Sequence, residues 1–293
     1  SILYTSKFLI SHIYHINSQE KRAENFRIYL ENMGPVFIKI GQLISSHPEW
    51  LNKYQYMQLS LLRNNISIKN DITKYLYNSD LNIIPKCVSN GSIATTHLGE
   101  YQNKKVLVKI KRNNIDSELK NTMFFFKPFA YISQYIPFIY KWNLYSKFNF
   151  INRIISKQIN FEAEVKNLIQ FKKYYHNIVK IPKVYNEVSN NNIIVMEYLP
   201  GISTDQILKN ITESEKKEIY KKFFGFLVTS INLRGLFHAD LHPGNFAWLK
   251  QDNNIDLILY DFGMVGSLDS KQLLTLNNFY LSLIQKNLEE CIK

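Results

Sequence analysis

The chain has 293 residues, 45% of them hydrophobic and 20% charged, which is enough for one large domain or two modest lobes with a core in each. No apolar run approaches the ~18 residues that a membrane-spanning helix needs, and two distant cysteines, Cys87 and Cys291, support neither a disulfide framework nor a zinc site. The net charge of +12 favours polyanions in general, but the lysines are spread along the whole chain, so we expect no nucleic-acid partner.

The first part of the chain has a helical pattern. Between Ser18 and about Asn65, apolar residues recur at three- and four-residue spacing, and Ser18 is placed to cap the first helix. Gly34 and Pro35 break this pattern, and Pro35 then suits the first turn of a second helix that Pro48 ends. We therefore expect an all-helical N-terminal section.

The pattern then changes to short runs that are typical of β-strands. Between Ile83 and Lys111 these runs are IIPKCV, IATTHLGEY and KKVLVKIK, separated by turn residues, which predicts three antiparallel strands. From about Asn113 to Tyr175 the pattern is helical again, interrupted at Pro128 and Pro137, and it ends in the helix FEAEVKNLIQFKKYY.

Strands and helices alternate in the rest of the chain. VKIPKVYNEV and NNIIVMEYL indicate two more strands, and helices are expected at about 203–209, at 213–234 and from about Ser270. Short strands should flank the two motifs described next.

Two motifs in this last section carry the strongest chemical signal. HADLHPGN, at 238–245, is followed by DFG at 261–263 after the apolar run IDLILY. Asp240 precedes Asn245 by five positions, as in the catalytic loop of a protein kinase, so Asp240 would face the acceptor. Asn245 and Asp261 would hold Mg²⁺, which prefers oxygen ligands. Either string alone is typical of an ordinary turn, but their order and separation favour phosphoryl transfer.

A kinase also needs a lysine on its third strand for the α- and β-phosphates of ATP. VLVKIK places Lys109 there, on the opposite face from the apolar residues Val106, Val108 and Ile110. The alternative is that this lysine simply faces solvent, as most lysines in β-strands do. The rival cations are Lys105, Lys111 and Arg112.

The partner of this lysine should be a glutamate on a helix. Glu162 and Glu164 both lie on FEAEVKNLIQF, where surface salt pairing is the ordinary role of either. We prefer Glu164, because an apolar stripe of Val165, Leu168 and Ile169 lies beside it. The long separation from the lysine requires an insertion between them.

The loop before the second strand is where a phosphate-binding loop should lie. It has Gly91 but no GxGxxG pattern, so the candidate groups are the backbone amides of residues 90–93 and the Ser92 hydroxyl. A plain hairpin turn is the alternative. VMEYLPG, at 195–201, suits the connection between lobes, where adenine is bound. The candidate ATP-binding residues are therefore Asn90, Gly91, Ser92, Ile93, Lys109, Glu197 and Leu199.

With these residues in place, the chain resembles the UbiB atypical kinase family, the aarF-domain proteins linked to coenzyme Q and other prenyl-lipid metabolism. GPVFIKIGQLISSHPEWL resembles the family's signature helix, whose Lys-x-Gly-Gln motif runs from Lys39 to Gln42 here. SNGSIATTHLG resembles the family's alanine-rich phosphate loop, and EAEVKN its Glu-Ala-x-x-Asn helix, with Glu164 as the lysine's partner. HADLHPGN is nearly the family consensus.

The resemblance implies an α+β, two-lobed protein-kinase-like fold with a helical N-terminal extension that packs over the active site and obstructs protein substrates. We expect the extension with its KxGQ motif at 1–70, a kinase-like N-lobe with a helical insertion at 71–196, and a kinase-like C-lobe at 197–293. Both a whole and a truncated C-lobe are compatible with the sequence. Lys39 and Gln42 would gate the nucleotide pocket. Without the family they are simply the polar side of an amphipathic helix.

Two departures from the family pattern affect the expected activity. Gln158 and Asn160 stand where the family has the acids of a Glu-x-Asp motif, which puts in doubt any metal or autoinhibitory contact of those acids. The phosphate loop contains Gly91 where the family tends to be alanine-rich, and a glycine there is associated in the family with altered nucleotide preference and activity.

Three functions are compatible with these motifs. The first is an ATPase or an atypical small-molecule or lipid kinase that uses ATP and Mg²⁺, with Asp240, Lys109 and Glu164 as its catalytic residues. The second, motivated by the lost acids, is a nucleotide-binding regulatory module or pseudokinase without turnover. The third is a conventional protein kinase, which the expected extension disfavours.

The family and the positive charge together imply a membrane-associated protein. The compartment implied by the family is a mitochondrial or bacterial inner membrane. The implied partners are anionic lipid, prenyl-lipid intermediates and a lipid-biosynthesis complex. A homodimer is also compatible with the family. Peripheral contact through Phe124 to Trp142, FFFKPFAYISQYIPFIYKW, is the physical form we expect. A buried helical pair, or a face covered by a partner, is the alternative.

Overall fold

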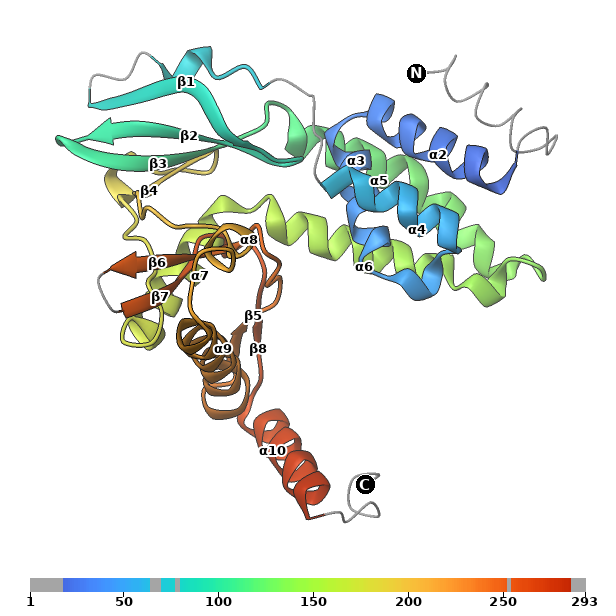
Figure 1. The fold of residues 1–293 in the computed structure, drawn as a ribbon. Helices are drawn as coiled ribbons and strands as arrows, with labels where there is room; N and C mark the ends of the chain where they lie inside the picture. The colour runs from blue at the N-terminus through green and yellow to red at the C-terminus, as the bar shows by residue number, and fades with distance from the viewer. Residues whose placement is uncertain (1–17, 64–69, 77–79, 252–253, 286–293) are drawn as a thin grey trace. The chain divides into compact units, whose positions relative to one another are not determined.

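The computed structural model describes residues 18–63, 70–76, 80–251 and 254–285 (Figure 1). The described chain forms two compact units. The first contains the described residues up to Asn160 together with Val188–Val195, and the second contains Phe161–Glu187 and the described residues from Met196 onward. The division into 1–70, 71–196 and 197–293 stays a prediction. Each unit is described by itself below.

The first unit begins with the expected helices, α2 (Gln19–Met33), α3 (Pro35–Ser45) and α4 (Lys53–Ser60). The Ser18 hydroxyl accepts a hydrogen bond from the Lys21 amide at 3.3 Å, and Pro35 occupies the first turn of α3, so both predicted helix starts are confirmed. Short 3₁₀ turns follow at Pro48–Trp50, Leu61–Arg63 and Thr73–Tyr75.

The three predicted strands are present and form one sheet with a fourth. The sheet has the order β1 (Leu81–Asn90), β2 (Ala94–Tyr101), β3 (Lys104–Lys111) and β4 (Ile193–Glu197). β2 and β3 pair antiparallel in an unbroken register that sets Lys109 opposite Thr96. The register of β1 shifts on both sides of Cys87, and the first shift, between Ile83 and Cys87, includes Pro85, which has no amide hydrogen to donate to a ladder.

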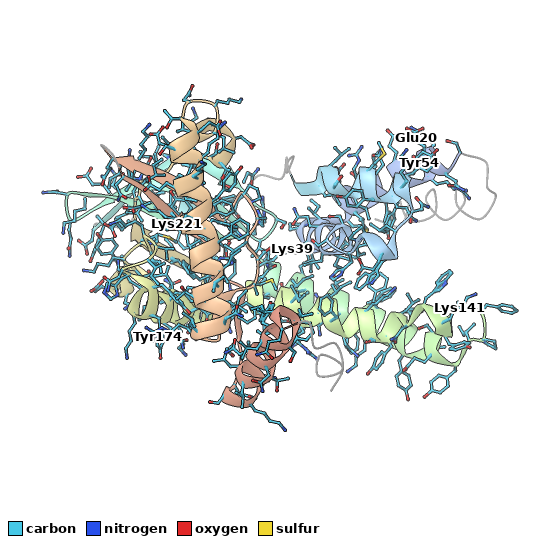
Figure 2. The ribbon with its side chains drawn as sticks, turned by 60° about the horizontal axis from the view of Figure 1, so that its bottom comes forward. Glu20, Lys39, Tyr54, Lys141, Tyr174 and Lys221 are labelled. Atoms are coloured by element: carbon cyan, nitrogen blue, oxygen red, sulfur yellow. The ribbon has the colours of Figure 1, made fainter. Side chains whose placement is uncertain are left out.

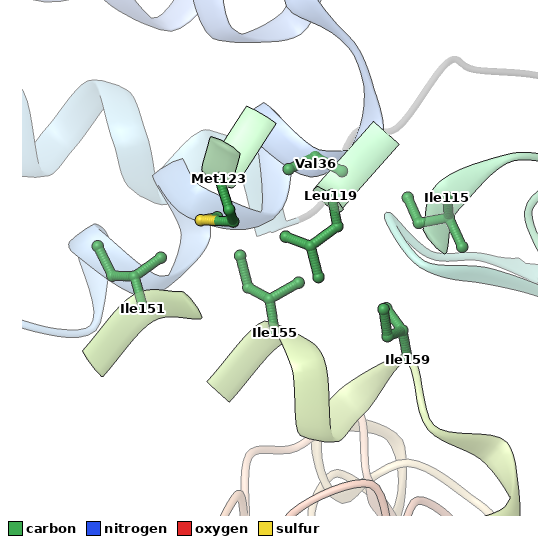
Figure 3. Close-up of a cluster of buried hydrophobic side chains, with 7 residues drawn as sticks. All are labelled: Val36, Ile115, Leu119, Met123, Ile151, Ile155 and Ile159. Carbon is green, nitrogen blue, oxygen red and sulfur yellow. The ribbon is translucent and has the colours of Figure 1, made fainter. Parts of the chain in front are cut away.

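Two long helices, α5 (Ile115–Ile132) and α6 (Leu144–Gln158), pair with each other and with α3. Short 3₁₀ turns connect them at Ser133–Tyr135 and Tyr140–Trp142. Their inward faces form one apolar cluster, shown in Figure 3. The buried members of this cluster are Val36, Ile115, Leu119, Met123, Ile151, Ile155 and Ile159.

The predicted interruption of the helix at Pro128 is wrong, since α5 continues through it to Ile132. A proline inside a helix removes the hydrogen bond to the carbonyl four residues earlier, here that of Phe124. Phe124 is 83% exposed, so water can take the place of the missing donor. This explains why the helix tolerates the proline.

The α3 helix is fixed to α5 by a carboxylate. The Glu118 side chain accepts a hydrogen bond at 3.2 Å from the amide of Val36, in the first turn of α3, where backbone amides lack partners within the helix. Burial raises the pKa of Glu118, while this hydrogen bond and the nearby Arg112 guanidinium lower it. Gly34 has φ +107°, and a Cβ there would lie 3.0 Å from the Glu118 carboxylate, so this approach requires glycine.

The second unit consists of α7 (Phe161–Tyr175), α8 (Thr204–Ile207), α9 (Glu213–Val228), a π turn (Thr229–Leu233), α10 (Ser270–Ile284) and two small antiparallel sheets. One sheet pairs β5 (Leu236–His238) with β8 (Val265–Ser267), and the other pairs β6 (Phe246–Gln251) with β7 (Asn254–Leu259). The predicted helices and the strands around both motifs are confirmed.

The predicted strand VKIPKVYNEV is wrong. Residues 179–188 make only isolated bridges, between Lys180 and Ile258 and between Val184 and Met196, and end in a 3₁₀ turn at Asn186–Val188. Pro182 interrupts this run and has no amide hydrogen to donate, which limits regular pairing.

Aromatic side chains fill the core of the second unit. Phe171, Tyr175, Phe226, Trp248 and Phe262 are at most 1% exposed. The Tyr175 hydroxyl donates a hydrogen bond at 2.6 Å to the Leu236 carbonyl, and burial raises the pKa of Tyr175 to about 12. This bond links α7 to β5, which leads into the HADLHPGN motif.

No helix within the described ranges is both long and apolar enough to cross a membrane.

We predict that Gly41→Ala destabilises the protein. A Cβ at this position would lie 2.4 Å from Leu62 and 2.8 Å from Leu30, two buried side chains that would both have to move. Overpacking of this kind costs about 1–3 kcal/mol, so the midpoint of thermal unfolding should fall.

Gly225→Ala is the matched control. Gly225 lies in α9 with nothing within 4 Å of an added Cβ, so alanine should raise stability by about 0.5–1 kcal/mol. Unfolding of Gly41→Ala at or above the wild-type temperature would contradict the packing.

Candidate functional site

The HADLHPGN segment is a compact loop between β5 and β6 of the second unit. The Asn245 side-chain nitrogen donates a hydrogen bond at 2.9 Å to the Asp240 carbonyl, and the Asn245 amide donates to the His242 carbonyl at 2.8 Å. Tyr260, next to the DFG triplet, donates its amide to the Asn245 carbonyl at 3.0 Å. Asn245 is buried and held through both its backbone and its side chain. The predicted Asp-to-Asn pair therefore belongs to one hydrogen-bonded loop.

His238 connects this loop to the DFG triplet. Its Nδ1 accepts a hydrogen bond from the Asp240 amide at 3.2 Å, and its Nε2 makes a hydrogen bond with the Asp261 carbonyl. Since a carbonyl can only accept, this pattern requires the neutral ring with its hydrogen on Nε2. Burial lowers the pKa of His238, which favours the same neutral form.

The DFG triplet is fixed from two further directions. The Asp261 carboxylate accepts a hydrogen bond from the Gly263 amide at 2.9 Å, which closes a tight turn. Phe262 is fully buried against Phe171 of α7 and His238, with ring centroids 5.2 Å and 5.7 Å away. The Asn167 side chain, also on α7, donates to the Phe262 carbonyl at 2.9 Å. Helix α7 therefore sets the position of the triplet.

These residues offer oxygen ligands that fit Mg²⁺. The described residues contain no group of three or more His, Cys, Asp or Glu side chains that could hold a metal by themselves. A set of one carboxylate, from Asp261, and one amide oxygen, from Asn245, is the kind that Mg²⁺ uses when phosphate and water complete its octahedron. The Asn245 side-chain nitrogen is engaged with the Asp240 carbonyl, so its oxygen is the atom suited to a metal.

Helix α7 also distinguishes between the two candidate glutamates. Glu164 is 1% exposed, whereas Glu162 is exposed. Glu164 lies on the buried face of α7 with Leu168 and Phe171, whereas Ile169, which the sequence analysis assigned to its apolar stripe, is 47% exposed and lies outside that face. Burial favours Glu164, because a buried carboxylate needs a charged or hydrogen-bonding partner.

The proposed adenine segment begins at Glu197, the last residue of β4. The Glu197 amide donates to the Lys183 carbonyl at 2.8 Å, and its carboxylate accepts from the Lys183 amide at 3.0 Å. The Leu199 carbonyl accepts hydrogen bonds from the Tyr260 hydroxyl and the Gly201 amide, both at 2.9 Å. These bonds fix the backbone of the segment.

In the first unit, Lys109 lies on β3 as expected. Val106, Val108 and Ile110 are fully buried, while Lys109 is only partly buried on the other face of the strand. Two of the rival cations are buried in structural roles. Lys111 pairs with Asp116 at 3.4 Å, and Arg112 binds the β1–β2 turn.

Arg112 holds this turn, the predicted phosphate loop, in shape. Its guanidinium donates to the Gly91 carbonyl at 3.0 Å and 2.8 Å and to the Asn90 side-chain oxygen at 2.7 Å. Its amide donates to the Ile93 carbonyl at 2.9 Å. The Gly91 amide is taken by the Ala94 carbonyl at 2.9 Å, so this candidate phosphate donor is already used within the turn. A Cβ on Gly91 would lie 2.9 Å from the same carbonyl.

Gln42 of the KxGQ motif contacts this loop directly. Its side-chain oxygen accepts a hydrogen bond from the Ser92 hydroxyl at 3.0 Å, and its side-chain nitrogen donates to the Leu62 carbonyl at 2.8 Å. Ser92 is 5% exposed, and its hydroxyl is bonded to Gln42 of α3. Lys39 is partly buried one turn earlier on α3 and is labelled in Figure 2.

The candidate residues thus fall into two groups. Lys39, Gln42, Lys109 and the loop at 90–93 belong to the first unit, whereas Glu164, Glu197, Leu199, Asp240, Asn245 and Asp261 belong to the second. The pairing of Lys109 with Glu164 would join the two units and stays a prediction.

The family can now be assigned. Residues 67–293 match the model of the ABC1 atypical kinase-like domain. The chain belongs to this family. A "Probable protein kinase UbiB" from Blochmanniella pennsylvanica is 27% identical over 285 residues, covering 91% of this chain and 52% of the relative. "Protein ACTIVITY OF BC1 COMPLEX KINASE 7, chloroplastic" from Arabidopsis thaliana is 25% identical, covering 89% and 39%. The chain therefore spans about half or less of the length of these relatives.

A solved structure confirms the fold. The structure titled "The complex structure of Rv3197-erythromycin from Mycobacterium tuberculosis" aligns with a TM-score of 0.57 and 20% identity, covering 71% of this chain and 52% of that chain. The mixed α and β kinase-like fold and the ABC1/UbiB family expected from the sequence are thus both confirmed. The family includes bacterial and chloroplastic members, so membership alone does not specify a compartment.

Three residues of this ABC1 domain have positioning roles that sequence reasoning missed. Asn167 holds the DFG backbone, His238 links that triplet to the HADLHPGN loop, and Arg112 shapes the β1–β2 turn. Each lay inside or beside a motif already selected, but Arg112 was considered only as a rival phosphate ligand. Their contacts are with backbone groups distant in sequence, which a motif does not reveal.

We predict that His238→Ala destabilises the protein more than His238→Gln. Alanine leaves the partly buried Asp240 amide and Asp261 carbonyl without this partner, which costs about 1–3 kcal/mol for each group that water does not reach. The side-chain N–H of glutamine lies about as far from the backbone as Nε2 of histidine and can still donate to the Asp261 carbonyl. The unfolding free energy of His238→Gln should therefore fall less than that of His238→Ala. The control is His176→Ala, since His176 is exposed and its replacement should stay within about 0.5 kcal/mol of wild type. Equal unfolding free energies for the two His238 variants would show that this link does not matter.

Proposed function

We propose that this chain binds Mg-ATP and transfers or hydrolyses its terminal phosphoryl group as an atypical kinase-like enzyme. The observation that carries the proposal is the single hydrogen-bonded network that holds Asp240, Asn245 and Asp261 together through His238. Phosphoryl transfer depends mainly on positioned charge, and this network would hold Asp240, whose carboxylate would face the acceptor, beside Asn245 and Asp261 as oxygen ligands for Mg²⁺. Bound Mg²⁺ would neutralise charge on the phosphate oxygens.

The remaining roles follow from the same proposal. Lys109 would contact the α- and β-phosphates and be held by Glu164, whose burial makes a cationic partner favourable. Residues 90–93 would lie over the phosphates. Adenine would be bound by the Glu197 carbonyl and the Leu199 amide, because the Glu197 amide and the Leu199 carbonyl are engaged elsewhere.

The acceptor we propose is a small molecule or lipid rather than a protein. Gln42 binds the Ser92 hydroxyl, so the N-terminal helices cover part of the loop that would enclose the phosphates. The Blochmanniella relative is named UbiB. We infer a role in prenyl-lipid or ubiquinone metabolism at a membrane, with a mitochondrial or bacterial inner membrane as the proposed compartment. Anionic lipids, prenyl-lipid intermediates and a lipid-biosynthesis complex are the proposed partners, and a homodimer is compatible with this role.

The second candidate is a nucleotide-binding regulatory module without turnover. It is favoured by Gln158 and Asn160, which replace the acids of the Glu-x-Asp motif. In such a module, ATP would stabilise one arrangement of the domain without being hydrolysed.

We predict Mg²⁺-dependent ATP hydrolysis that Asp261→Asn and Lys109→Ala each reduce at least about a hundredfold, because each removes a charge aimed at the phosphates. Hydrolysis is measured by phosphate release from the purified chain, with and without anionic liposomes. Lys105→Ala, on the same strand, is the matched control and should retain activity. ATP binding without turnover in every condition would support the regulatory module instead.

We also predict that Gln42→Ala increases ATP affinity or turnover. The hydrogen bond from Ser92 to Gln42 must break if the loop opens to admit phosphate. Losing one such bond should change ATP affinity or turnover about two- to tenfold. Gln58→Ala is the control, since Gln58 bonds Arg27 at 3.0 Å on the neighbouring helices. A fall in ATP affinity in Gln42→Ala would mean that Gln42 builds the loop rather than gating it.

A further inference from the structure

The α5–α6 hairpin, residues 115–158, exposes apolar side chains that its core does not use. Its buried residues, including Leu119, Met123 and Ile155, already form the cluster of Figure 3. Beyond that cluster lie seven large aromatic side chains, each at least 57% exposed, with Phe124 at 83% and Phe138 at 84%. We call these seven the aromatic tip: Phe124, Phe125, Phe129, Tyr135, Phe138, Tyr140 and Trp142.

The charge of the same segment is of one sign. From Leu119 to Phe161 the sequence contains no Asp or Glu. Its cations are Lys120, Lys127, Lys141, Lys147, Arg153 and Lys157. Lys127 and Lys141 are exposed and lie among the aromatic tip, and Figure 2 shows Lys141 at the end of the helix pair. Both kinds of side chain therefore face solvent on one element.

Exposed aromatics combined with lysines and no acids match the boundary of an anionic bilayer. Aromatic rings bury their apolar area among the upper acyl chains, while lysines extend to the phosphates. A surface of this size exposed to water would otherwise be unfavourable for a soluble domain. Pro128 and Pro137 lie within the segment, and the 3₁₀ turns between the helices carry Tyr135 and Trp142 outward.

A second copy of the chain fits this surface less well. A symmetric contact would bring two acid-free, positively charged segments together, and like charges oppose such a contact. A lipid surface supplies the opposite charge at every lysine.

We propose that the aromatic tip inserts into the interface of an anionic membrane and thereby anchors the domain. The proposal rests on the proposed location at a membrane but not on nucleotide turnover. Binding should require both the rings and the lysines: each lysine near an anionic surface contributes about a fivefold effect on affinity, and burial of each phenylalanine contributes about tenfold or more.

The test uses the complete chain and two kinds of vesicle, one of phosphatidylcholine alone and one that also contains phosphatidylglycerol. The chain should float with the anionic vesicles at low salt and be released at high salt. Phe124→Ser with Phe138→Ser, and Lys127→Glu with Lys141→Glu, should each weaken binding at least tenfold. Phe224→Ser and Lys221→Glu, at exposed positions on α9, are the matched controls and should bind as wild type.

Tryptophan fluorescence locates the contact. Trp142 is 57% exposed, so its fluorescence emission should shift to shorter wavelengths on anionic vesicles. Trp248 is 1% exposed, and its emission should not change. Trp142→Phe should abolish the shift and retain flotation. Flotation that is unaffected by the tip variants would overturn the proposal. Absence of flotation, with self-association that the tip variants abolish, would overturn it in favour of a second copy. ATP hydrolysis can fail without affecting either result.

Discussion

The neutral ring of His238 is the constraint on which the candidate chemistry depends. It accepts a hydrogen bond from the backbone of the HADLHPGN loop and makes another with the backbone of the DFG triplet, so it holds together two segments more than twenty positions apart. Burial keeps the ring neutral, and only the neutral ring can accept one bond while donating the other. Helix α7 completes this arrangement through Phe171 and Asn167.

In the first unit, a few side chains likewise fix the β1–β2 turn. Arg112 fixes the loop from the end of β3, and Gln42 closes it from α3. Gly41 allows α3 to lie close to Leu30 and Leu62, which in turn holds Gln42 in reach of Ser92. The last two positions of the motif thus have separable roles: Gly41 allows close packing and Gln42 makes the hydrogen bond to Ser92. Glu118 of α5 anchors the start of their helix.

Much of this could be predicted from sequence, and the reasons for the failures are physical. The capping by Ser18 and the alternation along β3 follow from local chemistry, so both were predicted correctly. Pro128 was misjudged because its effect depends on whether water can reach the freed carbonyl of Phe124. The run 179–188 was misjudged because β pairing depends on distant partners. The roles of Asn167 and Arg112 depend on backbone groups brought close only by the fold.

The central claim is that the second unit supplies a metal-dependent nucleotide site. It is tested most directly by calorimetric titration of ATP into the wild-type chain and the Asp261→Asn variant, with Mg²⁺ present and with Mg²⁺ removed by chelation. The account predicts that Mg²⁺ tightens ATP binding in the wild type and has little effect in the variant. ATP binding of equal strength in all four titrations, or none in any, would contradict it.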